Sequence, residues 1–131
     1  MLANVPVCAT VPTTDLERAR SFYRQALGLS EAATGRDGGV FFKAGGATML
    51  RIYERPGGHA PAAHTVAAFL VDDLDQEMSE LRRRGVSFEE YDLPHLKTDN
   101  GVYTDERRGV KGSWIKDPDG NILALTQLPK A

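Results

Sequence analysis

The chain has 131 residues, 41% of them hydrophobic, which is enough for a domain with a buried core but too few for two ordinary independent domains. Its 16 basic and 18 acidic residues give a formal charge of −2 and are spread along the sequence, so there is no basic stripe for a phosphate backbone or an anionic lipid surface. We therefore expect a single domain over residues 1–131 that binds neither nucleic acid nor membrane.

The compartment is inferred from the N-terminal segment and the cysteine content. Residues 1–6 have neither the basic start nor the apolar stretch of a secretory signal, and no segment approaches the roughly 20 apolar residues that span a bilayer. Cys8 is the single cysteine, so no disulfide can form within the chain. These features predict a cytoplasmic protein.

The first half begins with an apolar run from Cys8 that predicts a strand. Thr14 stands where a helix N-cap is expected, and Glu17, three residues later, completes a capping box. The predicted helix ends at Gly28, after apolar residues at helical spacing. These residues are Leu16, Ala19, Phe22, Tyr23, Ala26 and Leu27. A short strand from Leu29 and a hairpin over residues 40–53, "VFFKAGGATMLRIY", follow.

The second half repeats this order of elements. A strand from Val66 leads to Asp72 at the expected N-cap, with Asp75 three residues later. An amphipathic helix then ends at Gly85, and a short strand from Val86 is expected after it. A hairpin over residues 113–126, "SWIKDPDGNILALT", completes the copy. The sequence therefore predicts two βαβββ modules, at about 5–58 and 63–128.

Two details of the repeat bear on function. Aligning Lys43 with Lys116 places Phe41 on Trp114 and residues 49–52 on 122–125. The second copy also carries an insertion at about 91–109, rich in charged and turn-forming residues, which we expect to be a mobile loop.

Three segments carry a resemblance to a known family: "TTDLERARSFYRQALGL", "FLVDDLDQEMSELRRRGVSFEEYDLP" and, most specifically, "WIKDPDGNILAL". They resemble the vicinal oxygen chelate superfamily, which includes glyoxalase I, extradiol dioxygenases, fosfomycin-resistance enzymes and bleomycin-resistance binding proteins. The resemblance implies an α+β fold in which two βαβββ modules form a cupped, incomplete eight-stranded barrel. It further implies that the helices lie outside and the cavity within, and that the protein is a homodimer.

The resemblance also identifies positions at which a metal would be bound. Metal-using members draw His or Glu ligands from the first and last strand of each module, and these positions fall on Cys8, Arg51, Val66 and Ala124. None of them is His or a carboxylate, and a guanidinium repels a cation. We therefore expect no metal and no cofactor.

An alternative metal set stays open. His64 shares a strand face with Val66 and Ala68, and a site shifted toward the rim could use it, with Cys8 as a possible thiolate. The other interpretation is a solvated histidine at the start of a strand.

The predicted ligand cavity follows from the alternation of side chains along the four strands. Its face is mostly apolar with one cation, and Trp114 and Tyr103 are candidates for its wall and entrance, although Trp114 and Phe41 could instead be core residues. The strand positions on this face are Cys8, Thr10, Met49, Arg51, Tyr53, His64, Val66, Ala68, Leu70, Ile122, Ala124 and Thr126.

Arg51 needs a partner, because an unpaired charge in an apolar setting costs several kcal/mol. The partner is either an acid of the protein, such as Asp99 or Glu106 from the insertion, or a ligand anion, unless the guanidinium reaches water. The planar fork of an arginine suits a carboxylate or a phosphate.

These observations favour a metal-free small-molecule-binding protein, resembling the bleomycin-resistance class, that sequesters an aromatic or anionic compound. The competing hypothesis is an enzyme of the same family, a lyase, isomerase or dioxygenase. It would use either a shifted metal site near His64 or a metal-independent site in which Arg51 and tyrosines stabilise an oxyanion. A third possibility is a collapsed cavity and a protein that binds through its surface.

Overall fold

The computed structural model describes residues 1–55 and 57–130. The chain divides into two compact units, Met1–Pro61 and Ala62–Ala131. Among the described residues, no helix combines the length and apolar character needed to cross a membrane.

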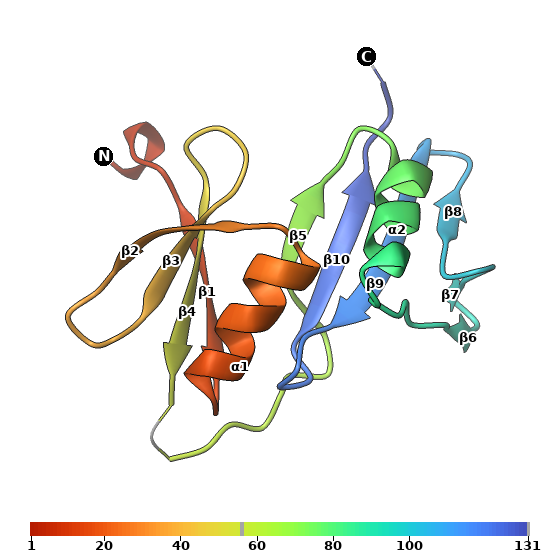
Figure 1. Ribbon diagram of the computed structural model, residues 1–131. Helices are drawn as coiled ribbons and strands as arrows, with labels where there is room; N and C mark the ends of the chain where they lie inside the picture. Colours follow the sequence, from red (N-terminus) through yellow and green to blue (C-terminus); the bar gives the residue numbers. More distant parts are fainter. Residues whose placement is uncertain (56, 131) are drawn as a thin grey trace. The chain divides into compact units, whose positions relative to one another are not determined.

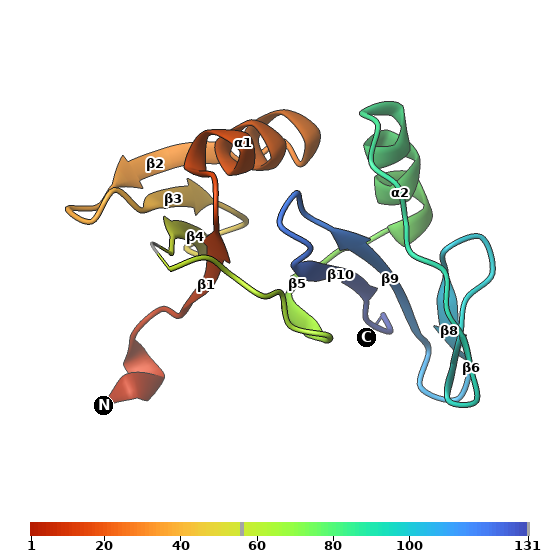
Figure 2. The same ribbon diagram turned by 90° about the horizontal axis from the view of Figure 1, so that it is seen from below.

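The first unit is a four-stranded sheet with a short N-terminal 3-10 helix and one longer helical segment between its first two strands (Figure 1). The strand order is β1-β4-β3-β2, with β1 parallel to β4 and the other neighbours antiparallel. Figure 2 shows α1 lying across one face of this sheet. The elements are η1 (Leu2–Asn4), β1 (Cys8–Thr13), α1 (Leu16–Ser21), the π-helical turn η2 (Phe22–Ala26), β2 (Ser30–Thr34), β3 (Val40–Lys43) and β4 (Met49–Glu54).

The second unit has the same arrangement of sheet and helix. Its strand order is β5-β10-β9-β8, with β5 parallel to β10, and a separate ribbon of β6 and β7 is added. The prediction of an α+β fold built from two modules is confirmed. The elements are β5 (Thr65–Leu70), α2 (Leu74–Arg83), β6 (Asp92–Leu93), β7 (Leu96–Lys97), β8 (Tyr103–Asp105), β9 (Val110–Lys116) and β10 (Ile122–Gln127).

Strand register confirms the alignment of the two halves. Phe41 pairs with Arg51 across β3 and β4, and Trp114 pairs with Ala124 across β9 and β10. The position aligned with Arg51 is therefore the alanine opposite Trp114.

Both helices begin one residue later than predicted. The N-caps are Asp15 and Asp73, whose carboxylates accept hydrogen bonds from the backbone N–H of Arg18 and Gln76, each at 3.1 Å. The expectation of caps at Thr14 and Asp72 is wrong. Adjacent residues in each copy have side chains able to cap a helix, so local preference alone does not separate them.

Burial alternates across the first sheet. Val11, Leu50 and Ile52 are buried on the face that packs against the helix, where Tyr23 contacts Phe42 with ring centroids 5.9 Å apart. Fully burying each large apolar side chain contributes about 1.5–3 kcal/mol. The intervening residues of β4 consequently point to the opposite face.

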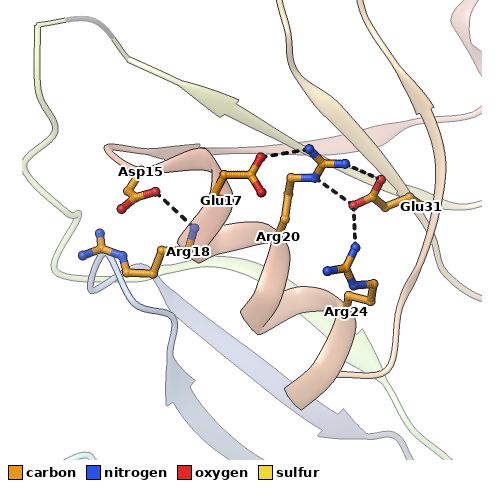
Figure 3. Close-up of polar contacts among 6 residues, drawn as sticks. All are labelled: Asp15, Glu17, Arg18, Arg20, Arg24 and Glu31. Carbon is orange, nitrogen blue, oxygen red and sulfur yellow. Dashed lines mark hydrogen bonds and ion pairs between the residues drawn. The ribbon is translucent and has the colours of Figure 1, made fainter.

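A network of arginines and glutamates joins α1 to β2 (Figure 3). Arg20 binds both carboxylate oxygens of Glu31 at 2.9 Å, while Arg24 lies 3.4 Å from the same carboxylate and Glu17 lies 3.0 Å from Arg20. The hydrogen bonds from Arg20 lower the pKa of Glu31. These contacts lie within one unit and fix the helix to the edge strand.

The predicted strand from Val86 is wrong, because residues 86–90 do not form one. The backbone N–H of Glu89 donates a single bond to the Trp114 carbonyl at 2.8 Å, and β8 pairs with the remainder of that edge of β9. The edge strand therefore comes from the segment predicted to be an inserted loop. Val86 is instead buried in the core of its unit.

Glu90 organises the segment that leads to β8. Its Oε1 accepts hydrogen bonds from the Thr98 hydroxyl at 2.7 Å and the Gly101 backbone N–H at 2.6 Å. Thr98 in turn accepts a hydrogen bond from the Tyr91 backbone N–H at 2.8 Å. The hydrogen bond from Thr98, followed by that from Gly101, lowers the pKa of Glu90.

This contact predicts a pH-dependent contribution to stability. Because the pKa of Glu90 is lower in the folded protein, its ionised carboxylate stabilises the fold at neutral pH, and this contribution is lost as the pH falls through the folded pKa. We expect Glu90→Gln to lower the free energy of unfolding at pH 7 and to have little effect at a pH below that pKa, as measured by urea denaturation. Glu106→Gln, at an exposed position, is the matched control. An equal loss at both pH values would contradict the prediction.

Candidate ligand-binding site

The guanidinium of Arg51 lies beside two aromatic rings on the face of the first sheet that points away from the helix. It is 4.9 Å from the ring centroid of Tyr53 and 6.0 Å from that of Phe41. Tyr53 is two residues along β4, and Phe41 is the cross-strand partner of Arg51, so strand geometry brings all three together. Cation–π contacts of this kind help to orient the guanidinium.

Asp37 is the ionic partner of Arg51, through Arg51 Nη2 and the carboxylate. Arg51 therefore pairs with an acidic residue of the protein, as one of the predicted alternatives had it. The residue is Asp37, and not Asp99 or Glu106. Asp37 precedes Arg51 by 14 residues and lies in the turn between β2 and β3. The glycine-rich turn "GRDGG" was the signal in the sequence, although nothing in it specified which cation the aspartate would meet.

The turn at residues 35–39 is shaped around the Asp37 carboxylate. The Gly39 backbone N–H donates to Asp37 Oδ1 at 2.9 Å, and a Cβ added at Gly35 or Gly39 would lie 3.1 Å from that oxygen. At Gly39 the same Cβ would be 3.2 Å from Arg51 Nε. The bond from Gly39 and the charge of Arg51 lower the pKa of Asp37. The carboxylate is therefore ionised at neutral pH.

The second unit has an aromatic cluster, which we define as Tyr91, Tyr103 and Trp114. Tyr91 meets the indole edge-on, with ring centroids 5.5 Å apart and an interplanar angle of 84°. Tyr103 lies at 6.3 Å and 51°. The indole Nε1 donates to the Thr65 hydroxyl at 3.1 Å, which fixes the orientation of the ring.

Small residues lie next to Trp114 in the sheet. Ala124 is its partner on β10, and Ala68 is the partner of Ala124 on β5. Gly112 precedes Trp114 by two residues, so it shares the same face, and a Cβ there would be 3.5 Å from the Cη2 atom of the indole. The surface of the sheet around Trp114 is therefore formed by aromatic rings and small side chains.

The predicted cavity residues fall into two groups, one in each unit. The structure brings Arg51 and Tyr53 together in the first unit, and Trp114 and Tyr103 in the second. Tyr91 was not among the predicted site residues, yet its ring centroid is closer to that of Trp114 than the centroid of Tyr103 is. The remaining first-unit positions are Cys8, Thr10 and Met49, and the remaining second-unit positions are His64, Val66, Ala68, Leu70, Ile122, Ala124 and Thr126.

The side chains of Cys8 and His64 bond to nearby backbone. Cys8 Sγ donates to the Ala9 carbonyl at 3.2 Å. His64 Nδ1 lies 3.0 Å from the Thr65 carbonyl, and because a carbonyl only accepts, Nδ1 carries the proton in this contact.

The sequence matches the Glyoxalase/Bleomycin resistance protein/Dioxygenase superfamily over residues 6–125. The chain belongs to this superfamily. A search of curated proteins gives no significant match. The superfamily assignment covers both modules and agrees with their shared order of elements.

Solved structures of superfamily members and related proteins resemble this chain over nearly its whole length. A glyoxalase/bleomycin resistance protein from Catenulispora acidiphila is 26% identical, with a TM-score of 0.71 and coverage of 96% of this chain and 100% of that one. TnmS3, an antibiotic-binding protein from a Streptomyces species, is 25% identical, with a TM-score of 0.69 and 98% coverage of both chains. A lactoylglutathione lyase from Agrobacterium tumefaciens is 22% identical, with a TM-score of 0.66 and coverage of 95% and 93%, which shows a shared fold.

The residues of this superfamily member do not fit a divalent metal ion at the positions that the resemblance indicates. Arg51 carries a positive charge that already pairs with Asp37, and Ala124 presents a methyl group beside Trp114. Over residues 1–55 and 57–130, no group of three or more His, Cys, Asp or Glu residues is arranged to hold a metal. These positions therefore lack the carboxylate and imidazole groups that such an ion prefers.

Proposed function

We propose that this protein is a metal-free small-molecule-binding protein that sequesters an aromatic compound. The observation that carries the proposal is the aromatic cluster, beside which the small residues Gly112 and Ala124 lie in the sheet. Trp114 is held by Thr65 and met edge-on by Tyr91, and Ala124 lies opposite it on the neighbouring strand. Rigid rings with little conformational entropy to lose suit the stacking of a flat ligand.

The similarity to TnmS3 supports sequestration as the role. That protein is described as antibiotic-binding, and its similarity to this chain extends over 98% of both. A sequestering protein needs affinity without an activated nucleophile, an oxyanion site or a catalytic metal. The rings of the aromatic cluster around Trp114 supply contact area for such binding.

Assembly and location complete the proposal. We propose a homodimer, because the resemblance to the bleomycin-resistance class implies one. The proposed location is the cytoplasm, since Cys8 has no other cysteine in the sequence to pair with. Light scattering of the purified protein tests the dimer directly.

Titration with planar aromatic antibiotics, followed by tryptophan fluorescence, tests the binding function. Trp114 is the only tryptophan, so its emission reports on one site. We expect saturable quenching by at least one compound, and a melting temperature that rises with its concentration. N-acetyltryptophanamide, titrated in parallel, controls for absorption by the compounds.

The same protein preparation tests the enzymatic alternative. Purified without chelator, it should contain no stoichiometric metal, and Zn, Ni, Mn and Fe(II) should leave its melting temperature unchanged. A flat response to every aromatic compound would overturn the binding role. Stoichiometric metal would instead favour an enzyme with a site near His64.

A further inference from the structure

Arg51 is the cation that the sequence predicted on a ligand-facing surface, and its charge is balanced by the Asp37 carboxylate. The Arg51 side chain is 22% exposed and that of Asp37 is 56% exposed, so the carboxylate lies on the solvent side of the pair. An acidic ligand approaching the guanidinium therefore meets a negative charge first. The two aromatic residues beside the guanidinium, Phe41 and Tyr53, are half-buried, so part of each side chain can make an apolar contact with a ligand.

The position of Asp37 depends on specific features of its turn. Neither Gly35 nor Gly39 can carry a side chain without crowding Asp37 Oδ1 at 3.1 Å, and Gly38 has a φ of +83°. The Gly39 N–H then fixes the carboxylate oxygen from the backbone side. Three glycines in five residues thus hold one carboxylate against one guanidinium.

Building on the proposed function, we infer that Phe41, Arg51 and Tyr53 form a second ligand surface, within the first unit, and that Asp37 sets its charge selectivity. The Asp37 carboxylate forms an ion pair with the Arg51 guanidinium and neutralises its charge. The surface formed by Phe41, Arg51 and Tyr53 therefore binds neutral planar compounds and disfavours acids. A planar amide can stack on the rings while its carbonyl accepts a hydrogen bond from a guanidinium N–H. A carboxylate of the same shape would stand beside a second carboxylate, where like charges repel. The anionic ligand considered from the sequence is thereby replaced by a neutral one.

Two probes of matched shape test this inference: naphthalene-2-carboxamide and naphthalene-2-carboxylate, titrated by calorimetry at pH 7.5. We expect the wild-type protein to bind the amide at least tenfold more tightly than the acid. Asp37→Asn should tighten binding of the acid at least tenfold and change the amide by less than twofold, because it keeps the shape of the side chain and removes the negative charge that neutralises Arg51. The double variant D37N/R51M should lose the gain for the acid.

Asp37→Ser provides a second test that retains an oxygen acceptor for the Gly39 N–H, and melting curves establish that each variant is folded. Equal affinity of the wild-type protein for both probes would overturn the inference while leaving the binding function in place. The inference would also be overturned if neither Asp37 variant changed the ratio of the affinities for the amide and the acid. If neither probe binds the wild-type protein and the antibiotic titration is also flat, the proposed function fails and the inference fails with it.

Discussion

Replacing Trp114 with alanine should weaken the binding of planar aromatic compounds by at least tenfold. The indole is the centre of the aromatic cluster, with Tyr91 at 5.5 Å and Tyr103 at 6.3 Å, so its removal takes away the largest stacking surface. Loss of an aromatic anchor typically costs about 2 kcal/mol or more in a binding site, which exceeds a tenfold change in Kd. Calorimetry is the appropriate measurement because the variant has no tryptophan to report by fluorescence.

Trp114→Phe is the matched control for this prediction. It keeps a ring on the sheet face and loses the Nε1 hydrogen bond to Thr65, so the loss of affinity should be only a few-fold. Both variants need melting curves, since the position is half-buried. Wild-type affinity in a folded Trp114→Ala variant would show that the aromatic cluster is structural and that ligands bind elsewhere.

Replacing Gly101 with alanine should lower the free energy of unfolding by about 2–5 kcal/mol. Gly101 has a φ of +81°, a conformation that costs an alanine about 1–2 kcal/mol. A Cβ there would also lie 3.0 Å from Phe88 Cβ and 3.2 Å from Met78 Cε, and such crowding in a packed region costs about 1–3 kcal/mol. Urea denaturation measures the total.

Gly85→Ala separates the two causes. Gly85 lies in the same unit with a φ of +87°, but an added Cβ would meet no atom within 4 Å. Its loss should be about 1–2 kcal/mol, the cost of backbone strain alone. Similar losses at both positions would show that the neighbours of Gly101 give way and that crowding contributes little.

The Gly101 contact also bears on the ligand site. Arg82 Nη2 donates to the Asn100 carbonyl at 2.9 Å, so the turn is bound to α2. Tyr91 and Tyr103 lie on either side of that turn along the chain. We therefore expect Gly101→Ala to weaken aromatic binding as well as stability.

Local patterns in the sequence were sufficient to predict the two modules and their hairpins. The apolar stripes ending at Gly28 and Gly85 predict helices because helical periodicity repeats within a few residues. The alignment of Phe41 with Trp114 was likewise predictable, because a hairpin's register follows from its own strands and turn. These features depend on short-range geometry, which single residues and their near neighbours encode.

The contacts that define the candidate site required the folded chain. Asp37 meets Arg51 because three glycines direct the turn, and Tyr91 meets Trp114 because Glu90 and Thr98 position its backbone. The edge strand β8 replaced the strand expected after α2 for a similar reason. Such pairings depend on where a loop goes in three dimensions, and that path results from packing between residues distant in sequence rather than from any local periodicity.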